Sequence, residues 1–214
     1  MPTATSDPNL RLVDPDDQRL IVTPKITVEQ LGRMIAAGVV EDRPSWELLD
    51  GVIVRVDKSA SGEDVMTINP GHATAVQRLA RLGARFEAHG CHTRNQMPIE
   101  LPPFNAPEPD GCVVVGDLAR YAARHPRPAD VLCVIEVADS SLLTDRRRKL
   151  RLYAQFGLPL YVILNLQTRQ AEVHAEPVAA ELRYARQQVL AAAERLQLPT
   201  ATGALVDIGI GELI

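Results

Sequence analysis

The hydrophobic pattern of the first part of the chain predicts a helix, a hairpin and a loop. Thr27 and Gln30 form a capping-box pattern, and the helix that it opens is predicted to end at Gly38. Residues 46–56 contain two apolar runs on either side of an Asp-Gly pair, which is the strongest short signal of a β-hairpin. Residues 57–71 are polar and are predicted to form a loop.

Farther along the chain, helical spacing alternates with short apolar runs. Residues 72–89 and 143–156 carry apolar side chains at helical spacing, and each segment is closed by a glycine. Strands are predicted at 97–101, 112–115, 131–137, 161–164 and 171–174. Residues 182–190 fit either a strand or a helix, and 205–214 suggest an edge element.

The order of these elements predicts an α/β fold of the α+β type, with a central mixed β-sheet flanked by helices and an N-terminal helix and hairpin. The run 131–137 is apolar on both strand faces, which is typical of a central strand. A chain of 214 residues fits one domain, which we expect over 25–214. Residues 1–24 are rich in Pro, Asp and Thr and are expected to form a flexible arm.

Composition narrows the classes of function. The net charge is −4 and the pI about 5.7, so a nucleic-acid-binding surface has to be a local basic patch. No apolar run reaches the roughly 18 residues of a membrane span, and a signal-peptide pattern is lacking, so we expect a cytoplasmic protein without membrane association. Cys91, Cys112 and Cys133 fit a reducing compartment. The spacing of Cys91 with His89 and His92 fits no common zinc module.

Glu136 is the most informative charged residue, because it lies inside the most apolar predicted strand. An ionised carboxylate there is unfavourable unless it is paired or bound to a cation. By strand alternation, Glu136 shares a face with Leu132 and Val134. It is therefore a candidate site residue. The alternative is a glutamate near the strand end that reaches water.

Asp110 stands at the start of the preceding predicted strand. If the two strands pair antiparallel, Asp110 and Glu136 meet at the same end of the sheet. Two convergent carboxylates suit a small hard cation such as Mg²⁺, with water and phosphate oxygens as the other ligands. Taken alone, Pro109-Asp110-Gly111 also fits a turn with a capping aspartate.

Lys149 lies on the predicted helix that follows the Glu136 strand, on one face with Asp145 and Tyr153 at i, i+4 spacing. If this helix folds back over the strand end, the ammonium group can reach a phosphate or a metal-bound water. The alternative is a solvent-exposed ion pair between Asp145 and Lys149. The neighbouring arginines fit either a solvated face or the local phosphate-binding patch; they are Arg146, Arg147, Arg148 and Arg151.

Several segments occur together in an order and spacing that a known family shares. They begin at Trp46 (Trp-Glu-Leu-Leu-Asp-Gly), His72, Pro109 (Pro-Asp), Glu136 (Glu-Val-Ala-Asp-Ser-Ser-Leu-Leu-Thr-Asp-Arg-Arg-Arg-Lys) and Leu152 (Leu-Tyr-Ala-Gln-Phe-Gly-Leu-Pro). This ordered set resembles the Uma-two family of restriction-endonuclease-like proteins, which belongs to the PD-(D/E)XK nuclease superfamily. The resemblance covers about residues 27–175.

The resemblance implies a restriction-endonuclease-like core with a metal-dependent nuclease site. Asp110 and Glu136 would be the metal ligands, assisted by the carbonyl of Val137. Lys149 would be the catalytic lysine, placed on the following helix and not two residues after the second acid, where this chain has Ala138. Secondary site residues, each of which also fits a structural role, would be Glu47, His72 and Tyr153.

The chain departs from the common form of the family in two places. Asp139-Ser-Ser141 stands where the family often has Ser-Pro-Ser, and Leu160-Tyr161-Val162 replaces Glu-Tyr-Trp after the glycine-proline turn. Both changes bear on packing more than on catalysis, because Asp110, Glu136 and Lys149 are intact.

These observations favour an Mg²⁺-dependent DNA endonuclease, with Mn²⁺ as a substitute metal and with the arginines beside Lys149 as phosphate-binding residues. Two other classes stay open. One is a catalytically silent nuclease fold that serves as a binding or assembly module, as a homodimer. The other is a metal-dependent hydrolase of a small phosphorylated substrate. A wide basic groove would favour nucleic acid, and a closed pocket would favour a small ligand.

Overall fold

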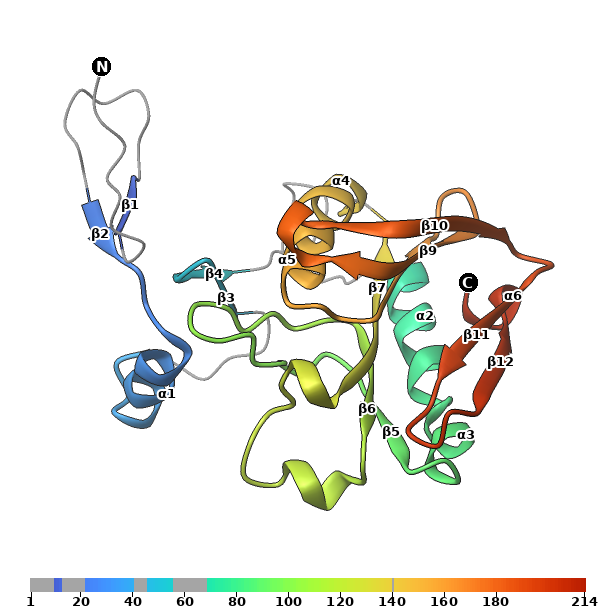
Figure 1. Cartoon of the computed structure of the whole chain (residues 1–214), viewed down its shortest axis with the longest axis horizontal. Coiled ribbons are helices and arrows are strands. Elements are labelled where there is room, and N and C mark those ends of the chain that lie inside the picture. The colour runs from blue at the N-terminus through green and yellow to red at the C-terminus, as the bar shows by residue number, and fades with distance from the viewer. Residues whose placement is uncertain (1–9, 13–21, 41–45, 56–68, 140) are drawn as a thin grey trace. The chain divides into compact units, whose positions relative to one another are not determined.

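A computed structural model of the chain describes residues 10–12, 22–40, 46–55, 69–139 and 141–214 (Figure 1). The chain divides into two compact units, one made of 1–56 with 100–107 and the other of 57–99 with 108–214. Most of the predicted arm 1–24 and of the predicted loop 57–71 lies outside the described residues.

The smaller unit contains two short antiparallel pairs and a helix. Its elements are β1 (Leu10–Leu12), β2 (Val22–Pro24), α1 (Val28–Ala36), β3 (Trp46–Leu49) and β4 (Val52–Arg55). The capping box of α1 is confirmed, because Thr27 and Gln30 exchange side-chain and backbone hydrogen bonds. The predicted hairpin is confirmed as well. Asp50 and Gly51 both adopt positive φ, 53° and 75°, as a tight hairpin turn requires.

The larger unit is built on a six-stranded sheet. Its strands are β5 (Cys91–Arg94), β6 (Gly111–Val115), β7 (Val131–Ala138), β8 (Leu160–Asn165), β9 (Gln170–Val178) and β10 (Arg183–Ala191). Their order is β10-β9-β8-β7-β6-β5, with β7 and β8 parallel and the other neighbours antiparallel. The predicted mixed sheet, with 131–137 as an inner strand, is therefore confirmed. The ambiguous segment 182–190 is a strand.

Helices and a separate hairpin cover this sheet. The helical elements are α2 (Pro70–Ala80), α3 (Gly83–Glu87), α4 (Leu142–Thr144), the π-helical segment η3 (Asp145–Lys149), α5 (Leu150–Gln155), α6 (Ile210–Leu213), and the 3₁₀ turns η1 (Leu118–Tyr121), η2 (Pro128–Asp130) and η4 (Ala179–Glu181). The hairpin of β11 (Arg195–Pro199) and β12 (Leu205–Gly209) forms the C-terminal part with α6, beside α2 (Figure 1). No helix in the described ranges has the length and apolar character needed to span a bilayer.

Two predictions about elements need correction, and one edge strand of the large sheet was not predicted. The single helix over 72–89 is two helices, α2 and α3, with a break at Arg81 and Leu82. Buried side chains keep helical spacing across the break, so the apolar pattern does not reveal it. The predicted strand over 97–101 is irregular, with one isolated bridge from Leu101 to Asn105. The edge strand β5 was not predicted, because its polar residues lack an apolar run.

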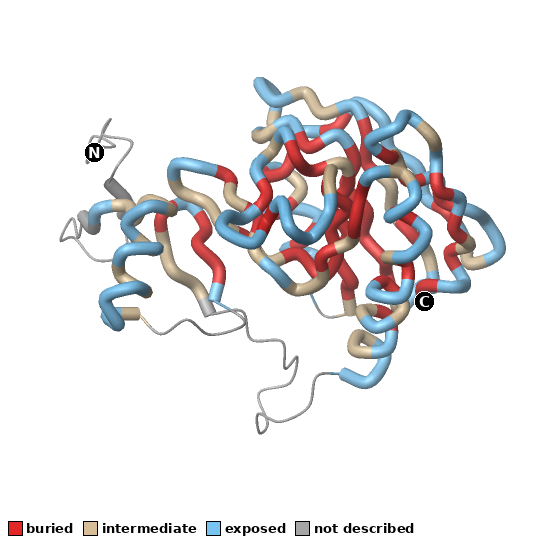
Figure 2. The backbone as a smooth tube through the Cα atoms, turned by 90° about the horizontal axis from the view of Figure 1, so that it is seen from below, coloured by how far each residue is buried: buried red, intermediate tan, exposed pale blue. Residues whose placement is uncertain are grey.

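The two faces of the large sheet have different partners. One face joins an aliphatic core with α2, α3 and the C-terminal hairpin, and its buried members include Val113, Cys133, Ile135, Val137, Val162, Leu164, Leu79, Phe86, Leu198 and Ile208. Buried segments concentrate in these strands (Figure 2). The opposite face carries Glu136, and by register also Tyr161 and His174. That face is covered by η3 and α5, and it holds the candidate site.

Candidate active site

Asp110 and Glu136 lie at the same end of the sheet. β6 and β7 pair antiparallel, with Gly111 opposite Ile135; Asp110 comes just before Gly111, and Glu136 comes just after Ile135. The predicted antiparallel pairing is thus confirmed. Both side chains are buried, with 6% and 3% of their surface exposed, so the alternative of a Glu136 that reaches water is wrong.

Backbone and side-chain donors hold the carboxylate of Asp110. Its Oδ2 accepts a hydrogen bond from the backbone N–H of Val137 at 2.9 Å and lies 3.1 Å from His72 Nε2. Gln96 Nε2 lies 3.5 Å from Oδ1, at the long limit of a hydrogen bond. Because the Val137 amide belongs to β7, the Asp110 carboxylate is fixed directly to the strand that carries Glu136.

The N-terminus of α2 places His72 at this carboxylate. Asn69 caps the helix through a bond from Gly71 N–H to its Oδ1, and the Asn69 amide nitrogen donates to Asp139 just after β7. This link ties the first turn of α2 to the end of β7, so His72 faces Asp110.

The carboxylate of Glu136 receives two donors from the following helix. Lys149 Nζ and Tyr153 OH both donate to Glu136 Oε1, each at 2.9 Å. Lys149 is 8% exposed and Tyr153 is fully buried, so this is a buried ion pair with a neutral donor beside it. The alternative prediction of a solvent-exposed ion pair between Asp145 and Lys149 is wrong, because Asp145 is also buried, with 2% of its surface exposed.

The segment that delivers Lys149 is π-helical and not α-helical. Asp145 to Lys149 form a wide turn between α4 and α5, closed by a bond from Leu150 N–H to the Asp145 carbonyl. Tyr161 OH, from β8, donates to the same carbonyl at 3.2 Å. π-Helical turns inside helices occur frequently at functional sites. Here the wide turn buries Asp145 and Lys149 and leaves the three arginines between them exposed.

The environment of the site is apolar, which strengthens its electrostatic interactions. Burial raises the pKa of Tyr161 well above its usual value, and the negative charges of Glu136 and Asp145 raise it further. Burial also raises the pKa of Cys112 to about 12, with Arg94 opposing that rise and Glu136 adding to it. Both groups therefore stay neutral at pH 7 and act as packing beside the charged residues.

The three predicted phosphate-binding arginines have different surroundings. Arg146 donates to both oxygens of Glu172 on β9, with contacts down to 2.6 Å. This pairing raises the pKa of Arg146. Arg147 and Arg148 are exposed on the same wide turn. A phosphate-binding role stays a prediction for all three.

Glu47 and Val137 are two further residues that the sequence placed at the site. Glu47 lies in β3 of the smaller unit and is buried, and its role near the site stays a prediction. Val137 contributes its backbone N–H to Asp110, and the predicted use of its carbonyl for a metal stays a prediction.

The zinc alternative around Cys91 finds no support in the geometry. Cys91 Sγ accepts a hydrogen bond from Ala201 N–H at 3.0 Å, and His92 Nδ1 lies 2.9 Å from the Gly116 carbonyl. Within the described ranges, no group of three or more His, Cys, Asp or Glu side chains is placed to hold a metal ion.

Residues around the end of β5 were missed by sequence reasoning. Asn95 Nδ2 donates to the Asp110 carbonyl at 3.2 Å, and Gln96 reaches the Asp110 side chain from a left-handed backbone with φ of 50°. Arg94, the last residue of β5, is 93% buried and packs against Tyr121. No sequence signal identified them, because the strand that positions them was itself unpredicted.

Comparison with known proteins adds two findings. The profile of a family described as "Uma2: Putative restriction endonuclease" matches residues 28–208. Among solved structures, the chain is similar to a "putative nuclease belonging to DUF820" from Anabaena variabilis, with a TM-score of 0.61 and 11% identity over 88% of this chain and 97% of that one. At this identity the likeness concerns the fold. No curated protein matches.

Proposed function

Since the chain belongs to the Uma2 family, whose description is "Putative restriction endonuclease", we propose that it is a divalent-metal-dependent DNA endonuclease. It hydrolyses phosphodiester bonds at a site formed by Asp110, Glu136 and Lys149. One observation supports this proposal: the buried carboxylate of Asp110 accepts from the backbone N–H of Val137, the residue after the buried Glu136, and a buried lysine donates to Glu136.

The donor set fits Mg²⁺. Two adjacent carboxylates are hard oxygen ligands, and Mg²⁺ is usually held by one or two carboxylates together with water and substrate phosphate. A cage of three or more protein ligands is not needed for such an ion. Mn²⁺ has similar oxygen preferences and is expected to substitute. When bound, the metal polarises the phosphate and supplies a water of lowered pKa.

Residues of the protein hold the two carboxylates in place and offset negative charge on the scissile phosphate. Lys149 is held at Glu136 Oε1, where its ammonium can offset negative charge that develops on the phosphate. Tyr153 fixes the same oxygen and so restricts the rotamer of Glu136. His72 and the Val137 amide restrict Asp110 in the same way. Arg147 and Arg148, exposed on the adjoining turn, are proposed to contact the flanking backbone.

The proposal is tested by incubating the purified chain with supercoiled plasmid, linear duplex and single-stranded DNA, with EDTA, Mg²⁺ or Mn²⁺. Nicking or linearisation that needs metal and is lost in Asp110→Asn is the expected result. Glu176→Gln, an exposed carboxylate on β9 paired with Arg186, is the matched control and should cleave normally.

Two outcomes would contradict the proposal in different ways. DNA binding without cleavage under any metal would point to a binding module. Metal-dependent hydrolysis of p-nitrophenyl phosphate without DNA cleavage would point to a small phosphorylated substrate. Light scattering during the same preparation measures whether the predicted homodimer forms.

A further inference from the structure

Within the part of the chain that the structure describes, Arg94 is a buried cation without an acceptor. Its side chain lies at the end of β5 and is 7% exposed, and its Nε is fully buried with no hydrogen-bond partner. Among the described residues it makes no ion pair and no hydrogen bond through its side chain. An arginine side chain keeps its charge in proteins, and a buried charge is unfavourable unless it is paired. Burial here lowers the pKa of Arg94, which reflects that unfavourable environment.

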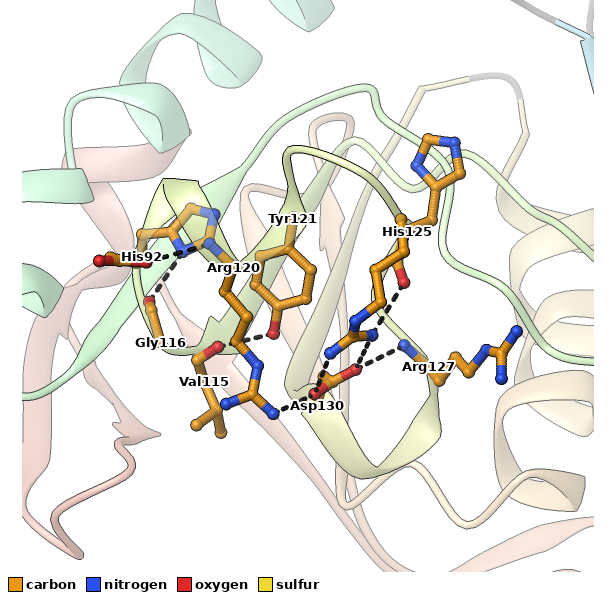
Figure 3. Close-up of polar contacts among 10 residues, drawn as sticks. His92, Val115, Gly116, Arg120, Tyr121, His125, Arg127 and Asp130 are labelled. Atoms are coloured by element: carbon orange, nitrogen blue, oxygen red, sulfur yellow. Dashed lines mark hydrogen bonds and ion pairs between the residues drawn. The ribbon is translucent and has the colours of Figure 1, made fainter.

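A cation-π contact with Tyr121 brings Arg94 into a larger group of arginines. Its guanidinium lies 5.6 Å from the centre of the Tyr121 ring, and the guanidinium groups of Arg120 and Arg124 lie 6.0 Å and 5.1 Å from the same centre. We call Arg94, Arg120 and Arg124 the Tyr121 arginine cluster. Tyr121 itself is anchored, because its hydroxyl donates to the Val115 carbonyl at 2.6 Å (Figure 3).

A single aspartate organises the outer part of the cluster. Asp130 accepts from Arg120 at 2.9 Å and from Arg124 at 2.7 Å (Figure 3). These hydrogen bonds hold the pKa of Asp130 well below its usual range, and the bond from Arg124 has the largest effect. Asp130 thus orients two guanidinium groups toward the ring that also touches Arg94. The side chains of Arg120 and Arg124 remain 47% and 39% exposed, so the cluster opens to solvent.

A groove of about 900 Å³ borders the cluster at Arg120. Its walls include Arg120 and His92 together with the acidic residues Glu87 and Asp117. His92 packs against Tyr121 at 5.4 Å between ring centres, and its Nε2 is buried without a hydrogen-bond partner. Two buried polar nitrogens without partners, on His92 and Arg94, therefore flank the same tyrosine.

The cluster and the candidate active site share one face of the sheet. Arg94 lies opposite Cys112, and Cys112 lies opposite Val134, two residues before Glu136 on the same face. The charges of Arg94 and Glu136 both act on the Cys112 thiol. Two strand spacings separate β5 from β7, which is about 10 Å. Along one DNA strand, about 10 Å of helix axis spans roughly three phosphates at about 3.4 Å each.

We propose that the Tyr121 arginine cluster binds a backbone phosphate of the nucleic acid, on the β5 side of the scissile phosphate. This inference rests on the proposed nuclease function and extends it to a second anion site. Guanidinium groups bind phosphate with two parallel hydrogen bonds, so the phosphate supplies the acceptors that Arg94 lacks. The bound backbone then lies across β6 toward Asp110 and Glu136.

The test compares the full-length wild type with Arg94→Met, Arg120→Gln and the control Arg81→Gln, an exposed arginine after α2. A labelled 20-base-pair duplex is titrated in EDTA at several salt concentrations, followed by fluorescence anisotropy. Arg94→Met should weaken binding about tenfold and lower the salt slope by about one, with a smaller loss in Arg120→Gln and none in Arg81→Gln. Inorganic phosphate should compete with the duplex in the wild type.

Thermal unfolding of the same proteins separates a ligand role from a structural one. Removing an unpaired buried charge should raise the melting temperature of Arg94→Met, whereas loss of a structural arginine should lower it. The inference would be overturned if Arg94→Met had a lower melting temperature than the wild type and Arg120→Gln bound DNA like the wild type. Wild-type affinity and salt slope in Arg94→Met would also overturn it.

A parallel cleavage assay with Mg²⁺ distinguishes the two proposals. If the wild type binds DNA through Arg94 but never cleaves it, the anion site stands and the nuclease function fails. If the wild type cleaves and Arg94→Met binds like the wild type, only the anion site fails. If no nucleic acid binds at all, both proposals fail.

Discussion

Lys149 and Arg94 are both buried cations on the same face of one sheet, and they differ in what they meet there. Lys149 is 8% exposed and donates a hydrogen bond to Glu136, which also accepts one from the Tyr153 hydroxyl. Arg94 is 7% exposed and, within the described ranges, meets the ring of Tyr121 but no acceptor. The two residues thus have the same burial and opposite electrostatic environments.

The presence or absence of a paired acceptor distinguishes a preorganised catalytic site from a proposed anion-binding site. A paired buried charge is set in position before substrate arrives, which is what catalysis of a charged transition state needs. An unpaired buried charge raises the free energy of the protein until a counter-ion binds. Mutations that remove either cation should therefore change stability in opposite directions.

The largest expected effect is on cleavage, from Glu136→Gln. This change keeps the shape of the side chain but removes a charge from the proposed metal site, so cleavage should fall by about a thousandfold or more. Plasmid nicking measures it, and circular dichroism checks that the fold persists. Glu176→Gln should cleave like the wild type. Unchanged nicking by Glu136→Gln would show that the chemistry lies elsewhere.

Next in size is the loss of stability in Lys149→Met. Glu136 would remain buried without its cation, which should lower the free energy of unfolding by about 3–5 kcal/mol. Urea unfolding measures this value. Arg94→Met is the matched comparison on the same face and should raise the same free energy by about 1 kcal/mol or more. The double variant Glu136→Gln/Lys149→Met should lose less than the sum of the losses in the two single variants, and a loss equal to that sum would mean that the pair is not coupled.

A smaller effect is expected from Asp130→Asn. Its pKa is lowered in the folded protein, chiefly by the hydrogen bond from Arg124, so Asp130 stabilises the fold above about pH 4 and loses this effect as the pH falls further. Asp130→Asn should cost about 1–3 kcal/mol at pH 7 and flatten the pH dependence between pH 5 and pH 3. Urea unfolding at several pH values in this range measures both quantities. A pH dependence as steep as that of the wild type would contradict the assigned role of Asp130.

The smallest expected effect concerns His174, on β9 beside Tyr161. The rings of these two residues stack at 5.8 Å, and both ring nitrogens of His174 are buried without hydrogen-bond partners. Burial lowers the pKa of His174. The unfolded chain therefore takes up the proton first as the pH falls below about 6.5, and wild-type stability should decrease there.

His174→Phe keeps the stacked ring without the polar nitrogens. It should raise the free energy of unfolding by about 1 kcal/mol and reduce the loss of stability between pH 7.5 and pH 5.5. Urea unfolding at the two pH values measures both quantities, and His89→Phe, a histidine outside this stack, is the control. An identical pH dependence in His174→Phe and the wild type would contradict the assigned cause.

Part of the site could be predicted because its residues break an otherwise apolar pattern. Glu136 stands out within a buried strand, and the loop between the two apolar runs permits antiparallel pairing with the strand after Asp110. Lys149 was placed correctly near Glu136, although through a π-helical turn that the spacing did not indicate. The break between α2 and α3 was missed, because the buried side chains keep helical spacing across it.

The apolar pattern of the sequence was enough to predict the four inner strands of the large sheet and the central position of 131–137, because buried strands need apolar side chains. The ordered motifs were enough to indicate the likeness to a nuclease family. The positions of the polar residues around these strands could be known only from the tertiary structure. Arg94, Gln96 and Tyr121 come from segments with no periodic signal, and their positions follow from the pairing of β5 and from the packing of the connection before β7. Such contacts depend on residues distant along the chain, so local spacing carries no record of them.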